Sequence, residues 1–496
     1  MKPSKVSRER SVSAQSAKMQ ARSTMINALV EFYRCPENLA TLASPEALRP
    51  QPGYFQFGPG AVAYGLSTFG TPPKLNGNRL PDMARSVTSH GSMLRLPFDA
   101  SNVIDNLRFE RYPTSMAAGA SALMASETAR RVYYFLRPTL NDSLRRILQR
   151  RFLQDWERLP FPNWPVDTSV EQILERLLVL SMGARKLDKI PFIWFWPDGA
   201  SNSAIVTHDV ETTAGIKFVP DLIEIDDAFG IKSSFQLVPE QRYHVSRQLI
   251  DNIRKRHCEV NVHGLNHDGN LFRDRKTFLK QAKLINRYIQ DFGAEGFRSA
   301  CMYRNVEWYE ELNMFYDMSV PNVAHLEPQR GGCCTVFPYF IGSILELPLT
   351  TVQDYSLFHI LGAYSIELWK KQIELITEKH GLVSFIVHPD YLLNERALSL
   401  YKTLLAYLSN LRSERKTWIA RPGDVNRWWR ERSAMNLVLE EGRWRIKGQG
   451  HERARIAFAC MKDDQLTYTV GRSSEAPADA GAAMSELLNA SVLKEG

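Results

Sequence analysis

Two carboxylates follow a short apolar run in the stretch AIVTHDVETT, residues 204–213. Side chains two residues apart on a strand point to the same side, so Asp209 and Glu211 should project together from the end of that strand. Like charges this close repel each other unless a cation or a base lies between them. An isolated pair of this kind is usually explained by Glu211 capping the next helix, so further residues must support a cation site.

Two histidines supply that support in CEVNVHGLNHDGN, residues 258–270. His263 ends a second apolar run and His267 comes four residues later, a spacing that on a helical turn places both rings on one face, where they can bind one metal ion. Such a spacing also occurs by chance. Here both pairs end a predicted strand, and two histidines with one carboxylate form a common catalytic zinc site that leaves a position open for water.

Two basic side chains fall at similar places. Arg298 follows a short apolar run in GFRSACMYRN, and His388 ends the run LVSFIVH. Each has an ordinary explanation, as a surface charge or as a hydrogen-bonded histidine at a strand end. Because all these residues lie at or just beyond the ends of apolar runs, they together predict a hydrolytic metal site at one rim.

The elements that must position these residues are short apolar runs that alternate with amphipathic helices from about residue 200. We predict strands at 203–209, 232–238, 258–264 and 382–388. Helices are predicted at 221–230, 246–256, 276–293, 365–381 and 395–411. This alternation predicts an α/β fold with a parallel sheet, open or closed into a barrel, and ligands bind at the carboxyl ends of such strands.

The order of these motifs over roughly residues 200–430 resembles the polysaccharide deacetylase family, the NodB-like carbohydrate esterases. The matching stretches are THDVE, HGLNH, FRSA, QDY and IVHPDY. The resemblance implies a distorted (β/α) barrel that removes acetyl groups from N-acetylated amino sugars. It also implies one divalent metal ion, with zinc as the first choice and cobalt, nickel or manganese as alternatives.

The resemblance further implies a role for each motif residue. Asp209 would be the base and Arg298 would hold it, while Asp354 of QDY would support His388 as the acid. The implied metal ligands are Glu211, His263 and His267.

Two positions depart from the family pattern. Asp-Val-Glu replaces an adjacent pair of Asp residues, which leaves open whether Asp209 also contacts the metal. Ala300 stands where the family has a proline, which bears on the oxyanion-binding backbone near Cys301.

Three alternative functions remain at this point. A related amidase or deformylase would keep every residue above and differ in the shape of its pocket. An iron oxygenase with two histidines and one carboxylate uses similar ligands, but it does not explain His388 or Arg298. A non-catalytic glycan-binding barrel is the third, because a fold alone does not fix a function.

The composition is that of a soluble globular protein, with 496 residues of which 44% are hydrophobic and 23% charged. Residues 1–23 are basic and lack the apolar core of a secretion signal, so we predict a disordered tail. Six cysteines without C-x-x-C spacing favour the reducing cytoplasm. The net charge of +8 permits anionic partners without selecting one, and we expect no nucleic acid among them.

The remaining regions carry weaker signals. We expect an accessory region of undefined fold at 24–195, the barrel at 196–433, a small β-meander at 434–471 and a flexible tail at 472–496. In "FIWFWPDG", Trp194 and Trp196 could stack on a sugar ring, although packing in the core is the more frequent role of such residues.

An arginine-rich helix in the accessory region bears on the location of the substrate. Eight arginines lie between Arg130 and Arg158, and Leu144, Ile147, Leu148 and Phe152 recur among them at helical spacing. Such a helix can lie on an anionic membrane surface, or it can dock on its own domain, which is the more frequent case. We expect a cytoplasmic protein, at the inner face of the membrane if the first alternative holds, that acts on an N-acetylated saccharide or a lipid-linked sugar. The sequence does not predict the oligomeric state.

Overall fold

The computed structural model describes residues 27–477 apart from 41, 44, 46, 76–78, 92 and 115–141. The predicted tail at 1–23 therefore lies outside the described residues. Within them, the central feature is a nine-stranded sheet with the order β12-β13-β11-β10-β9-β8-β7-β14, in which β15 also pairs with β7. None of the helices in the described ranges combines the length and the apolar character needed to cross a bilayer.

The strands of this sheet are parallel except for the pairing of β12 with β13. Strand β7 is buried along its whole length, as expected of a parallel strand covered on both faces. The bounds are β7 Ser203–Val210, β8 Ser234–Leu237, β9 Glu259–His263, β10 Gly296–Arg298, β11 Tyr316–Asp317, β12 Tyr339–Ile341, β13 Ile344–Glu346, β14 Leu382–Val387 and β15 Trp418–Ile419.

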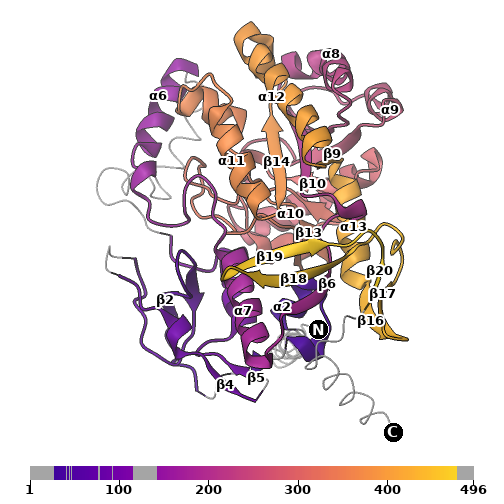
Figure 1. The fold of residues 1–496 in the computed structure, drawn as a ribbon. Coiled ribbons are helices and arrows are strands. Elements are labelled where there is room, and N and C mark those ends of the chain that lie inside the picture. Colours follow the sequence, from indigo (N-terminus) through magenta and orange to yellow (C-terminus); the bar gives the residue numbers. More distant parts are fainter. Residues whose placement is uncertain are drawn as a thin grey trace, which may run out of the picture.

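Helices follow most of these strands and cover the sheet, which gives the distorted (β/α) barrel that the sequence predicts (Figure 1). They are α8 Thr213–Ala228, α9 Arg247–Lys255, α10 Arg275–Phe292, α11 Glu367–Glu378, α12 Glu395–Glu414 and α13 Pro422–Ala434. Side chains cap several of their first turns, as Ser246 and Asp274 do for α9 and α10. The first of them, α8, begins well before the predicted start at residue 221, because the Thr212 hydroxyl caps it and Pro220 is accommodated inside.

The accessory region has its own small elements but shares the hydrophobic core of the barrel. Its bounds are α2 Ala28–Tyr33, η1 Glu37–Leu39, β1 Leu42–Ala43, β2 Gly53–Gln56, β3 Val62–Gly65, η2 Met83–Ser86, β4 Thr88–His90, β5 Met93–Arg95, α3 Ala100–Arg108, α6 Asp142–Leu153, η4 Trp156–Arg158, α7 Ser169–Arg185 and β6 Lys189–Ile193. Figure 1 shows β2, β4, β5 and α7 at the lower left, whereas α6 lies at the upper left, near α11. Helix α6 is therefore separated from the rest of the accessory region.

The C-terminal strands pair differently from a single meander. Strands β16 Asn436–Glu440 and β17 Arg443–Lys447 form one hairpin, and β18 Ile456–Lys462 and β19 Gln465–Val470 form another. Each hairpin gains a third strand, since β20 Glu475–Pro477 pairs with β17 and β6 pairs with β18. The start of the segment expected to be flexible, 472–496, thus contains a paired strand, and its remainder from 478 lies outside the described residues.

Candidate metal and catalytic site

The end of β7 separates its side chains onto two sides, as strand alternation requires. Asp209 and Glu211 turn toward the rim formed by the ends of the neighbouring strands, where they meet Arg298 and His263. His208 points the other way, and its ring nitrogens lie 3.1 Å from the carbonyl oxygen of Val387 and 3.0 Å from Asp226 Oδ2. The histidine beside the two carboxylates is therefore not part of the site.

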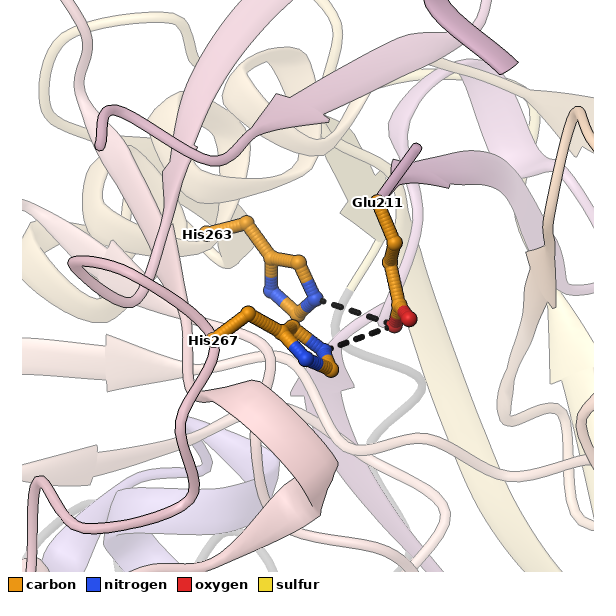
Figure 2. A group of neighbouring side chains, drawn as sticks. All are labelled: Glu211, His263 and His267. Atoms are coloured by element: carbon orange, nitrogen blue, oxygen red, sulfur yellow. Dashed lines mark hydrogen bonds and ion pairs between the residues drawn. The ribbon is translucent and has the colours of Figure 1, made fainter. Parts of the chain in front are cut away.

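Glu211, His263 and His267 form a cluster in which the side chains point toward one another (Figure 2). The Nε2 atoms of His263 and His267 lie 3.5 and 2.8 Å from Glu211 Oε1. One ligand atom from each of the three residues lies within 4.8 Å of the others. This spacing suits three donors around one small cation.

The two histidines reach this position without the helical turn that their spacing suggests, so that part of the sequence interpretation is wrong. The segment between β9 and α10 is a loop in which Gly264, His267 and Gly269 all have positive φ. Arg242 Nη2 donates a hydrogen bond to the backbone carbonyl of His267 at 2.9 Å and helps to hold this loop. The rings converge because the backbone reverses, and not because they share a helix face.

The hydrogen-bonding state of the cluster fits a metal ion. His263 Nδ1 lies 3.2 Å from the backbone carbonyl of Arg298, which favours a proton on Nδ1 and leaves the Nε2 lone pair for a metal. His267 Nε2 is buried and makes no hydrogen bond of suitable angle within the described residues, although Glu211 Oε1 is close. A buried nitrogen without a partner is costly unless an ion or water occupies the space beside it.

The pKa shifts of Glu211 and His267 also fit a metal ion. Burial alone would raise the pKa of Glu211, but the surrounding imidazoles, His267 first, lower that pKa well below its usual value. Burial lowers the pKa of His267, against the attraction of Glu211. An ionised carboxylate beside a neutral imidazole is the form in which both bind a divalent cation.

Asp209 is held by Arg298, which is buried. Arg298 Nη1 donates to Asp209 Oδ1 and to Thr207 Oγ1, both at 2.7 Å, and its Nε donates to the carbonyl of Met318 at 3.0 Å. Burial would raise the pKa of Asp209, but Arg298, followed by His263, outweighs it and lowers that pKa. Asp209 is thus an oriented, ionised carboxylate that can accept a proton.

His388 lies on the other side of Glu211. Its Nδ1 is 2.6 Å from Asp354 Oδ1, and its backbone N–H donates to Asp354 Oδ2 at 2.7 Å. Burial alone would lower the pKa of His388, but the Asp354 carboxylate raises it well above its usual value. Asp209, Glu211 and His388 also have ligand atoms within 4.8 Å of one another, yet a protonated imidazole cannot bind a metal, so we assign His388 to proton donation.

The structure brings together all seven residues that the sequence selects, namely Asp209, Glu211, His263, His267, Arg298, Asp354 and His388. It places Trp194 and Trp196 elsewhere, with 2% and 0% of their surface exposed. Their indole N–H groups donate to the carbonyls of Ala200 and His380. Both side chains pack in the core, and neither can stack on a sugar.

Sequence reasoning missed several residues around this cluster. Thr207 could have been found, because it lies two residues before Asp209 on the same face of β7. The ring of Tyr391 is 4.8 Å from that of His388, and Gln353 Nε2 donates to the buried Glu327 at 2.7 Å. Arg242, Glu327 and Gln353 lie in irregular segments, where no periodic pattern marks them.

Comparisons with known proteins give matches among solved structures alone. No family model and no curated protein matches the sequence significantly. A structure described as a polysaccharide deacetylase from Mycobacterium smegmatis has a TM-score of 0.40 and 18% identity, covering 50% of this chain and 97% of its own. A polysaccharide deacetylase from Pseudomonas aeruginosa has a TM-score of 0.37 and 14% identity, with 47% and 92% covered.

An allantoinase is also similar, with a TM-score of 0.39, 13% identity, and 47% of this chain and 92% of its own covered. The matches are thus to about half of the present chain and to nearly the whole of each solved structure. About half of the chain is thus similar to solved structures described as polysaccharide deacetylases and to an allantoinase.

Proposed function

We propose that this protein is a metal-dependent hydrolase that removes N-acetyl groups from the amino sugars of a glycan or of a lipid-linked saccharide. The observation that carries the proposal is the convergence of three candidate metal ligands with a carboxylate held by an arginine and a histidine held by a carboxylate at one rim. The resemblance of the motifs supplies the substrate class.

Glu211, His263 and His267 would hold the ion, and zinc is the first choice for two histidines with a carboxylate. Such an ion would supply a Lewis acid that lowers the pKa of bound water toward about 7 and polarises the acetamide carbonyl. These three side chains are well suited to that task because the pKa values of Glu211 and His267 are both lowered.

Asp209 acts as the base. It takes a proton from the water that attacks the acetamide carbon, and general base catalysis of this kind contributes about 10²- to 10⁴-fold. Arg298 keeps the carboxylate ionised and aimed through the 2.7 Å hydrogen bond to Oδ1.

His388 acts as the acid. An amide nitrogen cannot leave as an anion, so His388 donates a proton to it as the C–N bond breaks, and the products are acetate and the free amine. Asp354 stabilises the imidazolium before that transfer, which is the reason for its 2.6 Å contact with Nδ1.

The test is acetate release by the zinc-loaded full-length protein from N-acetylglucosamine oligomers and from a lipid-linked N-acetylated sugar. We expect activity that His388→Ala lowers about 10²- to 10⁴-fold. His451→Ala is the control, since this histidine is exposed and distant in sequence from every motif. Full activity of H388A would overturn the mechanism, and release of another acid from another amide would favour the amidase alternative.

We propose further that the protein works in the cytoplasm, with the rim of the site facing an anionic membrane. Helix α6 contacts the segment that follows Asp354, because Arg150 Nε donates to the carbonyl of His359 at 2.8 Å and Tyr355 donates to Gln149. Beside these contacts α6 exposes 61% of Ile147, together with Arg151. None of the six cysteines belongs to a disulfide, which fits a reducing compartment.

Vesicle sedimentation tests this location. We expect the protein to bind vesicles that contain about one third anionic lipid, because the arginines of α6 are attracted to an anionic surface. It should not bind vesicles of neutral lipid. Ile147→Asp should weaken this binding, whereas Met461→Asp, at a distant exposed residue, should not. Equal binding to both vesicle types would contradict the proposal.

A further inference from the structure

The accessory region contacts the catalytic rim through one buried ion pair. Glu110 follows helix α3, and its carboxylate accepts two hydrogen bonds from the guanidinium of Arg304. The Nε bond measures 2.6 Å, and the side chains of Arg304 and Glu110 are 1% and 11% exposed. Two parallel bonds between a guanidinium and a carboxylate fix orientation as well as distance.

Arg304 in turn ties the loop that follows Arg298. Its Nη1 donates to the carbonyl of Met302 at 2.9 Å, and its backbone N–H donates to the side chain of Gln329 at 3.0 Å. The Gln329 amide donates back to the carbonyl of Arg304 at 3.1 Å. The side chain and the backbone of Arg304 are thus both held in place.

The loop that is held in this way has an unfavourable backbone. Cys301 and Met302 have φ values of 57° and 53°, in the left-handed region that residues with a side chain rarely adopt. Such a conformation persists only where surrounding contacts determine it. The Glu110–Arg304 pair is a contact from the accessory region that reaches these residues, through the bond from Arg304 to the Met302 carbonyl.

This loop adjoins the candidate metal ligands. The backbone N–H of Gly264, next to His263, donates to the carbonyl of Arg298 at 2.8 Å. A side-chain carbon at Gly264 would lie 3.4 Å from Ala300 Cβ, so the loop and the histidine segment are in close contact. A shift of the loop would therefore change the space between the metal ligands and the Cys301 backbone.

Glu110 also contacts a segment that leads toward Asp354 and the proposed general acid His388. The backbone N–H of Gly332 donates to Glu110 Oε1 at 2.6 Å, and Tyr112 donates to the carbonyl of Gly332 at 2.5 Å. The same segment carries Glu327, which accepts from Gln353, the residue directly before Asp354. One carboxylate of the accessory region thus anchors segments on both sides of the site.

We propose that Glu110 is a positioning residue for catalysis: through Arg304 it holds the loop 299–304 in its present conformation, directly after Arg298 and beside the segment that carries His263. This inference rests on the proposed function. It makes Glu110 of the accessory region part of the working site.

The experiment compares two variants that each break one ion pair between the accessory region and the barrel. Glu110→Gln removes the charge at the rim, and Glu175→Gln removes the 2.7 Å pair with Lys379, far from the loop. In the zinc-loaded full-length protein we expect E110Q to lower kcat about 10- to 100-fold with little change in KM, since a displacement of about 1 Å can cost that much. E175Q should leave kcat within about twofold of wild type, and both should bind zinc as wild type does.

Hydrogen exchange separates this inference from the proposed function. We expect the amides of 299–304 to exchange faster in E110Q than in E175Q, whether or not the assay substrate is the natural one. Unchanged exchange in that loop would overturn the proposed clamp, and faster exchange with unchanged kcat would overturn its catalytic role. If E110Q does not fold, Glu110→Asp takes its place, because it keeps the charge and should change both readouts in the same direction by a smaller amount.

Discussion

On the two faces of β7, a histidine meets a carboxylate in two different surroundings. On the outer face, His208 lies 3.0 Å from Asp226, which also accepts hydrogen bonds from Ser233 at 2.6 Å and Tyr401 at 2.6 Å. On the inner face, His267 lies 2.8 Å from Glu211, and its Nε2 makes no suitable hydrogen bond within the described residues. The outer His208 and Asp226 side chains thus have hydrogen-bond partners, whereas the inner His267 Nε2 atom has none of suitable angle within the described residues.

This difference shows what separates a structural histidine from a candidate ligand. Both histidines are buried beside a carboxylate, so burial and proximity do not distinguish them. Each oxygen of Asp226 has donors of its own, while Glu211 remains 20% exposed and faces three imidazoles. The groups on the outer face therefore satisfy one another, whereas those on the inner face have the arrangement that we propose for an ion site.

The largest expected effect separates these two histidine environments. His263→Ala should remove stoichiometric zinc and bring acetate release to the uncatalysed rate, because two remaining ligands hold the ion poorly. His208→Gln, the matched change on the outer face, should keep both zinc and activity. Metal analysis with an acetate assay checks the pair, and loss of zinc in H208Q alone would reverse the comparison.

The second prediction compares Asp209 on the inner face of β7 with Asp226, the partner of His208 on the outer face. Asp209→Asn should lower kcat about 10²- to 10⁴-fold and retain zinc, because the amide cannot accept the proton. Asp226→Asn should leave kcat close to wild type and lower the midpoint of thermal unfolding. Kinetics and calorimetry on the same preparations decide this, and a fall of kcat in D226N comparable to that in D209N would refute the distinction.

A third carboxyl group, Glu171, shows how burial changes the pKa of a carboxyl group that has no cation in contact with it within the described residues. Burial raises the pKa of Glu171 to about 7, whereas Thr335 only partly opposes the shift. The folded state is stabilised by the protonated, neutral form of Glu171. This stabilisation is complete below pH 4.5, the usual pKa of a glutamic acid, and is lost as the pH rises through about 7. At about 1.4 kcal/mol per unit, Glu171 alone should cost wild type about 3 kcal/mol over this range.

The measurement is denaturant unfolding at several pH values between 4.5 and 7.5. Glu171→Gln cannot ionise, so its stability should fall less than that of wild type over this range. Parallel curves for the two proteins would mean that Glu171 is not neutral in the folded state at low pH.

The smallest effect is expected on the outer face. Ser233→Ala removes one of the donors to Asp226 Oδ2 while His208 stays in contact with it, and one hydrogen bond contributes about 1 kcal/mol. Thermal unfolding should show that loss with zinc content unchanged. A loss several times larger would indicate that the outer network acts as one cooperative unit.

The sequence predicts the barrel where its elements are long. Strands β7, β9 and β14 have five to eight residues and stand out as apolar runs, as do α10 and α12. Strands β10, β11 and β13 have two or three residues, too few for any alternation to appear, so they were not predicted. Their pairing depends on the sheet that the longer strands form.

The site residues also fall into a part that the sequence predicts and a part that it does not. Asp209, His263 and His388 are predictable because they end long strands, and the carboxyl ends of parallel strands meet at one edge. The shape of the loop at His267 and the contact of Glu110 with Arg304 are not predictable, because they join segments far apart in the chain through irregular backbone. Local periodicity carries no information about such contacts.

The central claim is that one ion lies among Glu211, His263 and His267. The most direct test is anomalous diffraction at the zinc edge from crystals of the zinc-loaded protein. Our account predicts a single strong peak about 2.0–2.2 Å from a Glu211 oxygen and from the Nε2 atom of each histidine. A map without density there, or with zinc bound only at other residues, would contradict it.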